Sequence, residues 1–197
     1  ETQARSNKKY KFDKRKEHLK QTLAFLTRRD FPFVSAYIGH ALFVNELREI
    51  FPHALFIRLK RDPLSTAYSI LKLRKKQFGS HFSVFPKECQ AFSDSNIYRQ
   101  VAAQVYFLNK RIDNACDPER TVDISYEGLC ANPEIELKRI TSFCNYKGMF
   151  LDLYNYVPNS FDCSNVNPDF DHDSGQLDAE LRYMRSCEEN VADSKNE

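Results

Sequence analysis

Two residues that could bind an anion lie eight positions apart in the segment Arg61 to Ser69, which has the sequence RDPLSTAYS. Asp62 is a favourable N-cap, and Pro63 suits the first position of a helix, where its missing N–H costs nothing. The helix dipole and free backbone N–H groups attract an anion there, and an arginine adds paired donors that suit phosphate. Ser69 lies nearly two helical turns beyond Asp62, so the side chains of Arg61 and Ser69 could flank one phosphate. Spacing alone leaves open that Arg61 only pairs with a carboxylate and that Ser69 is a surface residue.

Two strands are expected to position this turn and a second one. Ala54 to Lys60 (ALFIRLK) predicts a strand leading into a helix from Pro63 to about Gln77, and Thr121 to Ser125 (TVDIS) predicts a strand that ends at Tyr126. Strands separated by helices predict an α/β domain, with a parallel sheet flanked by helices. Ligands bind at the carboxyl ends of such strands, which directs attention to Arg61 and Tyr126.

The remaining segments predict further elements. We expect helices over 14–26, 41–51, 97–114, 133–144 and 177–189, a strand over 31–37, a long loop over 78–94 and irregular structure over 150–175. The long loop is of the kind that often covers a substrate site, and His81 within it could meet substrate.

Two blocks of the sequence resemble sulfotransferases. FPHALFIRLKRDPLSTAYSILK is similar to the family's FPxAkFIxxxRDPxxxAxS, and ISYEGLCANPEIELKRITSF, over 124–143, is similar to its YExLxxxPxxxLxrIxxF. The resemblance implies a three-layer fold with nucleotide-kinase-like topology and 3′-phosphoadenylyl sulfate as the sulfuryl donor. It further implies that Arg61 and Ser69 bind the donor's 3′-phosphate and that Tyr126 lies near its nucleotide. Adenosine 3′,5′-bisphosphate would be the second product, and the transfer demands no metal.

The resemblance is weaker where the sulfuryl group would be transferred. The family's base follows the preceding strand, and His40 occupies that place, where a neutral imidazole could take a proton from an acceptor hydroxyl. A purely structural role for His40 is an equal alternative. The family's lysine is missing just upstream of His40, and no loop like PRSGTT, which grips the 5′-phosphosulfate, occurs in the chain. We expect that loop to lie upstream of Glu1, so that 1–197 forms the C-terminal two-thirds of a single sulfotransferase domain.

Composition and charge restrict the other classes of protein. Hydrophobic residues make up 42% of the 197 residues, but no apolar run is long enough to span a membrane. Residues 1–30 hold ten Lys or Arg against four Asp or Glu, and residues 150–197 hold three against eleven. We interpret residues 1–13 and 190–197 as flexible, solvated ends and expect no nucleic-acid partner. Six scattered cysteines indicate reduced thiols, which favours the cytoplasm over the Golgi lumen.

Other interpretations remain open at this stage. A nucleotide-kinase-like phosphotransferase would share the sheet, and a non-catalytic relic of the sulfotransferase fold would keep nucleotide binding without transfer. The acidic stretch DFDHDSGQLDAE, over 169–180, resembles a calcium loop, but Ser174 stands where such a loop needs glycine, so a solvated turn is favoured. The acceptor, a small molecule or a glycan with a hydroxyl or an amine, and the oligomeric state are not specified by these motifs.

Overall fold

The computed structural model describes residues 2–26, 32–76, 84–153 and 156–193, and the side chains of 13–25, 32–76, 84–153 and 156–187. The chain divides into two compact units. The first comprises residues 1–37 and 45–54, and the second comprises residues 38–44 and 55–197. The second unit contains the four residues predicted to bind the donor or to act as the base, which are His40, Arg61, Ser69 and Tyr126.

The first unit contains helix α1 (Thr2–Leu26) and most of helix α2 (Val44–Ile50). An ion pair from Lys16 to Glu49 joins the two helices. The predicted helix over 14–26 is confirmed and begins earlier, but Phe25 is 89% exposed, so its apolar side chain is not part of a packed face. The predicted strand over 31–37 is wrong for its described part, because residues 32–37 form no strand. Apolar and β-branched residues make a strand only where a partner strand accepts their hydrogen bonds.

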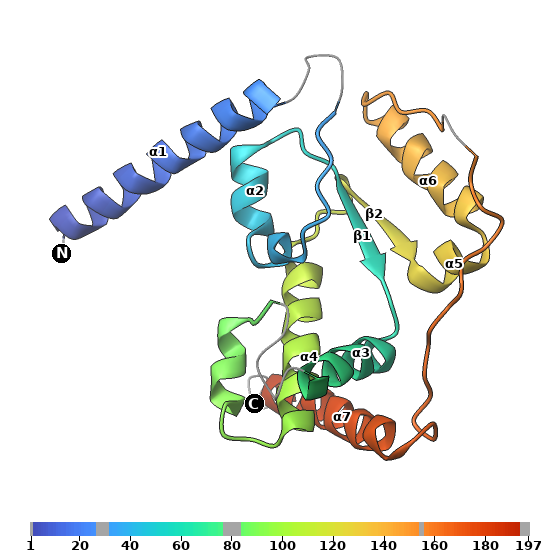
Figure 1. Ribbon diagram of the computed structural model, residues 1–197. Helices are drawn as coiled ribbons and strands as arrows, with labels where there is room; N and C mark the ends of the chain where they lie inside the picture. Colours follow the sequence, from blue (N-terminus) through green and yellow to red (C-terminus); the bar gives the residue numbers. More distant parts are fainter. Residues whose placement is uncertain (1, 27–31, 77–83, 154–155, 194–197) are drawn as a thin grey trace. The chain divides into compact units, whose positions relative to one another are not determined.

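A two-stranded parallel sheet forms the centre of the second unit (Figure 1). Strand β1 (Phe56–Lys60) pairs with strand β2 (Thr121–Ser125) over their whole length, from Phe56 opposite Thr121 to Lys60 opposite Ser125. Both predicted strands are confirmed. The predicted α/β class with a parallel sheet flanked by helices is also confirmed.

A cross-strand ion pair supports this register. Arg58 lies directly opposite Asp123 and donates two hydrogen bonds to its carboxylate, at 2.7 Å and 2.5 Å. The Arg58 guanidinium, helped by the Lys60 ammonium, lowers the pKa of Asp123 to about 2. The same guanidinium reaches Asp113 of helix α4 (Ile97–Ala115) at 2.6 Å, so it also ties the sheet to a helix.

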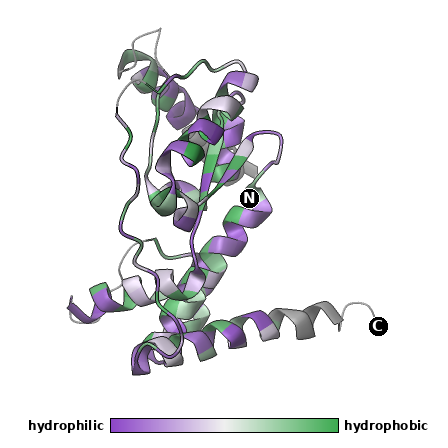
Figure 2. Cartoon of the chain, turned by 90° about the vertical axis from the view of Figure 1, so that its right-hand side faces the viewer, coloured by the Kyte–Doolittle hydropathy of each residue, from purple (hydrophilic) through white to green (hydrophobic). Residues whose placement is uncertain are grey.

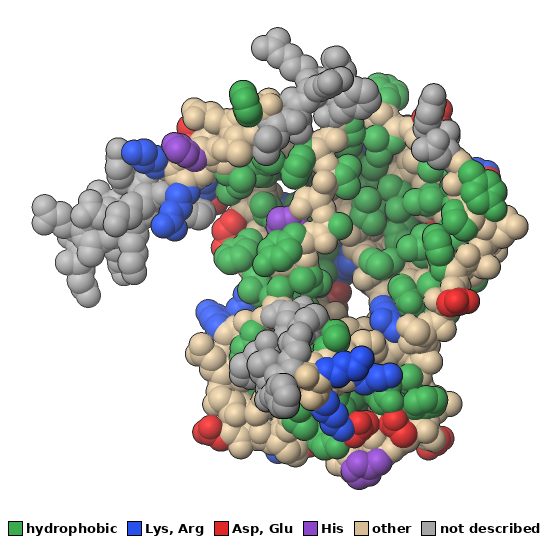
Figure 3. Space-filling model, viewed as in Figure 1, with side chains coloured by type: hydrophobic (Ala, Val, Ile, Leu, Met, Phe, Trp, Pro, Cys, Tyr) green, Lys and Arg blue, Asp and Glu red, His purple; other side chains and the backbone are tan. Residues whose placement is uncertain are grey.

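Short helices follow β2 and cover part of the sheet. Helix α5 (Tyr126–Ala131) starts directly after the strand, and helix α6 (Pro133–Tyr146) lies against Val122 of β2. The neighbouring strand is less well covered, since Ile57 and Leu59 are 48% and 51% exposed. Figure 3 shows hydrophobic side chains gathered over this part of the surface. The apolar side of β1 is therefore only half covered by the described residues.

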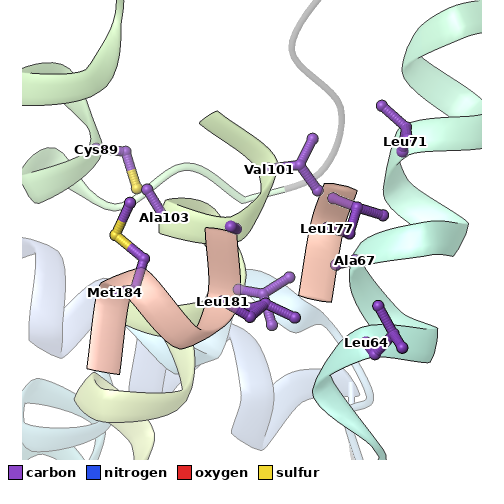
Figure 4. Close-up of a cluster of buried hydrophobic side chains, with 11 residues drawn as sticks. Leu64, Ala67, Leu71, Cys89, Val101, Ala103, Leu177, Leu181 and Met184 are labelled. Carbon is purple, nitrogen blue, oxygen red and sulfur yellow. The ribbon is translucent and has the colours of Figure 1, made fainter. Parts of the chain in front are cut away.

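The hydrophobic core of the second unit lies between three helices (Figure 4). These are α3 (Pro63–Lys76), α4 and α7 (His172–Asp193). Figure 2 shows α7, which leads to the C-terminus, as a mixture of hydrophobic and hydrophilic residues, as expected for a helix with one packed face. The buried side chains are Leu64, Ala67, Leu71, Cys89, Val101, Ala102, Ala103, Val105, Leu177, Leu181 and Met184.

The remaining parts of the second unit are short or irregular. Residues 38–42 form the 3₁₀ helix η1 (Ile38–Leu42), and η2 (Lys87–Phe92) lies within the predicted loop over 78–94. Residues 77–83 of that loop, with His81, lie outside the described residues. The described residues between α6 and α7 are irregular, as predicted, but α7 begins at His172, within the range of 150–175 that was expected to be irregular. Within the described ranges, no helix is both long and apolar enough to cross a membrane.

The core predicts that two leucines on α3 contribute very different amounts to the free energy of unfolding. Leu71 is fully buried and Leu73 is 37% exposed. We expect Leu71→Ala to lower the free energy of unfolding by about 2–5 kcal/mol, because it leaves a cavity between three helices. Leu73→Ala should cost less than about 1 kcal/mol. Chemical denaturation of the two variants measures both values, and equal losses would contradict this description of the core.

Candidate functional site

The turn between β1 and α3 has the predicted helix cap. The Asp62 carboxylate accepts hydrogen bonds from the backbone N–H of Ser65 at 2.7 Å and from the Ser65 hydroxyl at 2.6 Å. Pro63 is the first residue of α3. The cap fixes the direction of the helix start, where backbone N–H groups and the dipole favour an anion.

Arg61 lies beside Tyr126 at the carboxyl ends of the two strands. The guanidinium carbon of Arg61 is 4.4 Å from the centroid of the Tyr126 ring, in a cation–π contact. Each residue follows directly after its strand, and the last residues of the strands, Lys60 and Ser125, lie opposite one another. The structure therefore brings together two of the residues that the sequence singled out.

A segment from the irregular connection, Phe161 to Val166, crosses this site, and we call it the strap. Arg61 Nη2 donates to the Ser164 carbonyl at 2.6 Å and lies 3.2 Å from its hydroxyl, and Nε is 3.5 Å from Asn165 Oδ1. The backbone N–H of Val166 donates to the Ser65 hydroxyl at 3.0 Å. Within the described part of the chain, Nη1 of Arg61 has no acceptor, so this amine can donate to a ligand.

Glu127 connects the turn, the second strand and the strap. Its carboxylate accepts hydrogen bonds from Asn165 Nδ2 at 2.8 Å, Ser125 Oγ at 3.0 Å and the backbone N–H of Asp62 at 3.3 Å. The Asn165 amide, together with backbone N–H groups and the Ser125 hydroxyl, lowers the pKa of Glu127 to about 2. Glu127 is therefore ionised at neutral pH and holds Asn165 against Arg61.

Sequence reasoning missed the roles of Glu127, Ser164 and Asn165. Glu127 stands beside Tyr126 in the second family-like block, so its position in that block was a usable signal. The strap residues lie 103 and 104 positions from Arg61 in a segment with no periodicity, and no local pattern indicates their contact.

Neither Ser69 nor His40 takes part in the contact between Arg61 and Tyr126. Ser69 lies on α3, and its hydroxyl donates to the Ser65 carbonyl at 2.9 Å, so it would have to rotate in order to donate to a phosphate. His40 lies on η1, which packs against α4. In the described part of the chain, none of the contacts that gather Arg61 and Tyr126 involves His40.

The acidic stretch before α7 caps a helix. Asp171 accepts the backbone N–H of Ser174 at 2.8 Å and a hydrogen bond from the Tyr68 hydroxyl. Asp173 pairs with Lys75 at 2.6 Å and accepts from the Tyr98 hydroxyl at 2.9 Å. These carboxylates join α7 to α3 and α4. The described residues contain no group of three or more His, Cys, Asp or Glu side chains that could hold a metal ion.

Comparisons with known proteins agree on one family. A family model described as "Sulfotransferase family" matches residues 6–149. The omega-hydroxy-beta-dihydromenaquinone-9 sulfotransferases Stf3 of Mycobacterium bovis and Mycobacterium tuberculosis are each 27% identical over 149 residues, which cover 74% of this chain and 36% of theirs. The chain therefore spans about a third of the length of these relatives. A solved sulfotransferase domain from the curacin biosynthetic pathway is 16% identical, with a TM-score of 0.47 over 74% of this chain and 59% of that one.

The lowered pKa of Glu127 predicts that the stability of the strap depends on pH. Because its pKa in the folded chain, about 2, is below its ordinary value of 4.5, its stabilising contribution is complete above about pH 4.5 and is lost as the pH falls toward 2. We expect Glu127→Gln to lower the free energy of unfolding by about 1 kcal/mol at pH 7 and to speed amide hydrogen exchange in the strap. This difference from the wild type should disappear as the pH approaches 2.

Glu134→Gln provides the matched control, because Glu134 is an exposed carboxylate on α6 that pairs with Lys138. It should leave exchange in the strap unchanged. Equal exchange in the strap for Glu127→Gln and the wild type at pH 7 would show that Glu127 does not hold this segment.

Proposed function

The chain belongs to the sulfotransferase family, and from this we propose that it binds the adenosine 3′-phosphate end of 3′-phosphoadenylyl sulfate for sulfuryl transfer to a hydroxyl or an amine. The observation that carries the proposal is the contact of the Arg61 guanidinium with the Tyr126 ring, two residues before α3 begins. A phosphate at this point would meet a fixed positive charge and the positive end of a helix dipole. The ring of Tyr126 adds an apolar face that suits a nucleoside.

The described contacts fit a phosphate group. Arg61 is held by the strap through Nη2 and Nε, which fixes the plane of its guanidinium and leaves Nη1 for the ligand. The Ser69 hydroxyl lies two turns into the same helix and becomes a second donor once it leaves the Ser65 carbonyl. The preformed arginine reduces the entropy lost on binding, because its side chain is already ordered.

The transfer requires an acceptor activated in line with the sulfur. The acceptor oxygen or nitrogen attacks the sulfur, the bond from sulfur to the bridging oxygen of the donor breaks, and adenosine 3′,5′-bisphosphate leaves. We propose His40 as the base that takes the acceptor's proton. The family's lysine is missing beside His40, so other groups must stabilise the charge on the bridging oxygen.

We further propose that residues beyond these 197 hold the 5′-phosphosulfate. The chain contains no loop of the PRSGTT type, and the stretch that matches the relatives makes up 74% of this chain but only 36% of theirs. Parallel sheets are usually covered on both faces, whereas Ile57 and Leu59 of β1 are half exposed. A larger domain that places its donor loop beside β1 would account for both observations.

The acceptor is proposed from general chemistry and one relative. The relatives are named as sulfotransferases of an omega-hydroxylated menaquinone, that is, of a small molecule with a hydroxyl group. We propose a hydroxyl on a small molecule as the first acceptor class to test, with a glycan as the second. No nucleic acid is expected as a partner.

Arg61 gives the direct test of donor binding. We expect Arg61→Ala to weaken the binding of adenosine 3′,5′-bisphosphate to the full chain by about 10- to 100-fold, because charge-assisted hydrogen bonds contribute about 1.5–3 kcal/mol. Titration calorimetry measures the affinity. Arg182→Ala is the control, since Arg182 is an exposed arginine on α7 that pairs with Asp178.

Adenosine 5′-monophosphate and ATP are the two comparison ligands for this experiment. Adenosine 5′-monophosphate lacks the 3′-phosphate and should bind the wild type and Arg61→Ala equally weakly. Wild-type binding of the bisphosphate that is no tighter than that of the monophosphate would reject the proposed site. Tighter binding of ATP than of the bisphosphate would favour the phosphotransferase interpretation.

His40 should affect the rate and not donor affinity. In an active protein that carries this chain, we expect His40→Ala to slow transfer from 3′-phosphoadenylyl sulfate by about 100-fold or more, as for loss of a general base. Its affinity for the bisphosphate should stay within about twofold, since base removal leaves the phosphate site intact. His53→Ala is the control, because His53 is exposed just after α2. An unchanged rate would exclude His40 as the base.

A further inference from the structure

Two cysteines lie on neighbouring segments beside the Arg61 site. Cys130 lies in α5, is only 4% exposed, and has its Sγ 4.0 Å from the Asp162 carbonyl of the strap. The Cys130 carbonyl accepts a hydrogen bond from the backbone N–H of Phe161 at 2.7 Å, so α5 and the strap already lie side by side. Cys163 is an exposed strap residue that directly follows Asp162, and desolvation and the neighbouring Cys130 thiol both contribute to a raised pKa of the Cys163 thiol.

We propose that Cys130 and Cys163 form a reversible disulfide that fastens the strap to α5. A disulfide needs two sulfur atoms that can approach to about 2 Å without moving the backbone, and here the backbones on both sides are joined by a hydrogen bond. The other four cysteines lie on separate parts of the second unit: Cys89 in η2, Cys116 after α4, Cys144 in α6 and Cys187 in α7. The structure therefore singles out one pair of the six thiols.

The reaction is a thiol–disulfide exchange with a small disulfide such as oxidised glutathione. The exposed Cys163 thiolate attacks one sulfur of that disulfide and releases one glutathione thiolate. The Cys130 thiolate then attacks Cys163 Sγ, forms the intramolecular bond and releases the second glutathione thiolate. Two protein thiols are oxidised and one external disulfide is reduced. Desolvation raises the pKa of the Cys163 thiol, and the neighbouring Cys130 thiol raises it further, so the exchange should accelerate as the pH rises.

The disulfide would act on the residues that hold Arg61. Ser164 and Asn165, which directly follow Cys163, accept the hydrogen bonds of the Arg61 guanidinium. Fastening Cys163 restricts the motion of these two residues and so keeps the guanidinium ordered before a ligand arrives. This consequence rests on the proposed donor site, whereas formation of the disulfide does not.

Mass spectrometry of the full chain tests the pairing. The protein is incubated with oxidised glutathione at pH 8, alkylated without reduction and digested. We expect one linked peptide, joining Cys130 to Cys163, in the wild type and in the Cys187→Ser control. Cys163→Ser should give no such peptide, and Cys163 is exposed, so the substitution should leave the fold intact. Alkylation of both thiols in the wild type, or preferential linkage of another pair, would overturn the proposal.

Two further measurements separate this proposal from donor binding. Closing a loop of about 30 residues should raise the Tm of the oxidised chain by about 5–10 °C, and reduction by dithiothreitol should reverse the increase, in the wild type but not in Cys163→Ser. If the chain binds adenosine 3′,5′-bisphosphate, oxidation should tighten binding about threefold or more, and equal affinities would overturn the effect on Arg61. If neither redox state binds the nucleotide, the donor site is rejected, while the linked peptide and the Tm still decide the disulfide.

Discussion

The register of the two parallel strands is the constraint on which the candidate site depends. Lys60 and Ser125 lie opposite one another at the ends of β1 and β2, so the next residues, Arg61 and Tyr126, emerge side by side. A slip of one residue would turn every side chain of the strand to the other face of the sheet. The doubly hydrogen-bonded pair of Arg58 and Asp123 opposes such a slip, because each must lie opposite the other to make both bonds.

Within the described residues, the contacts of Arg61 orient its guanidinium and leave its positive charge unneutralised. The positive guanidinium of Arg61 is oriented by neutral acceptors, the Ser164 carbonyl and the Asn165 side chain, and the anionic Glu127 contacts Asn165 and not Arg61 itself. A carboxylate bonded directly to Arg61 would compete with a phosphate for the same donors. An intermediate amide orients the arginine without neutralising it, and this distinguishes the arrangement from the simple ion pair that the spacing left open.

Local signals predicted those parts of the fold that depend on local interactions. The strands β1 and β2 and the helices α3 and α4 were predicted within about two residues, because alternation, helical spacing and the Asp62–Pro63 start are all encoded nearby. The expected strand over 31–37 was wrong for its described residues, 32–37, because β propensity does not supply a pairing partner. The exposure of Ile57 and Leu59 also escaped prediction, because apolar alternation does not show which strand face receives a covering helix.

The sequence predicted the part of the candidate site that lies directly after the two strands. Arg61 and Tyr126 follow two recognisable strands, and the carboxyl-end rule for parallel sheets brings them together. The strap could not be predicted, because its contacts with Arg61 and Ser65 connect irregular residues to positions about a hundred residues away. Ser69 was predicted from its place on the helix, but its hydroxyl bonds its own helix, a local competition that side-chain spacing does not reveal.

Helix α3 explains how one element can serve both the core and the site. Leu64, Ala67 and Leu71 recur at intervals of three and four residues and are buried against α4 and α7. Ser65 and Ser69 lie four residues apart on another side of the helix, where Ser65 meets the strap and Ser69 bonds the helix backbone, and Arg61 lies in the turn just before them. Both sets of residues lie on one helix. The packing of Leu64, Ala67 and Leu71 therefore fixes where Ser65 and Ser69 lie along and around the helix axis. The geometry of the proposed anion site at the start of α3 therefore depends on a core that contains none of the residues proposed to bind the anion.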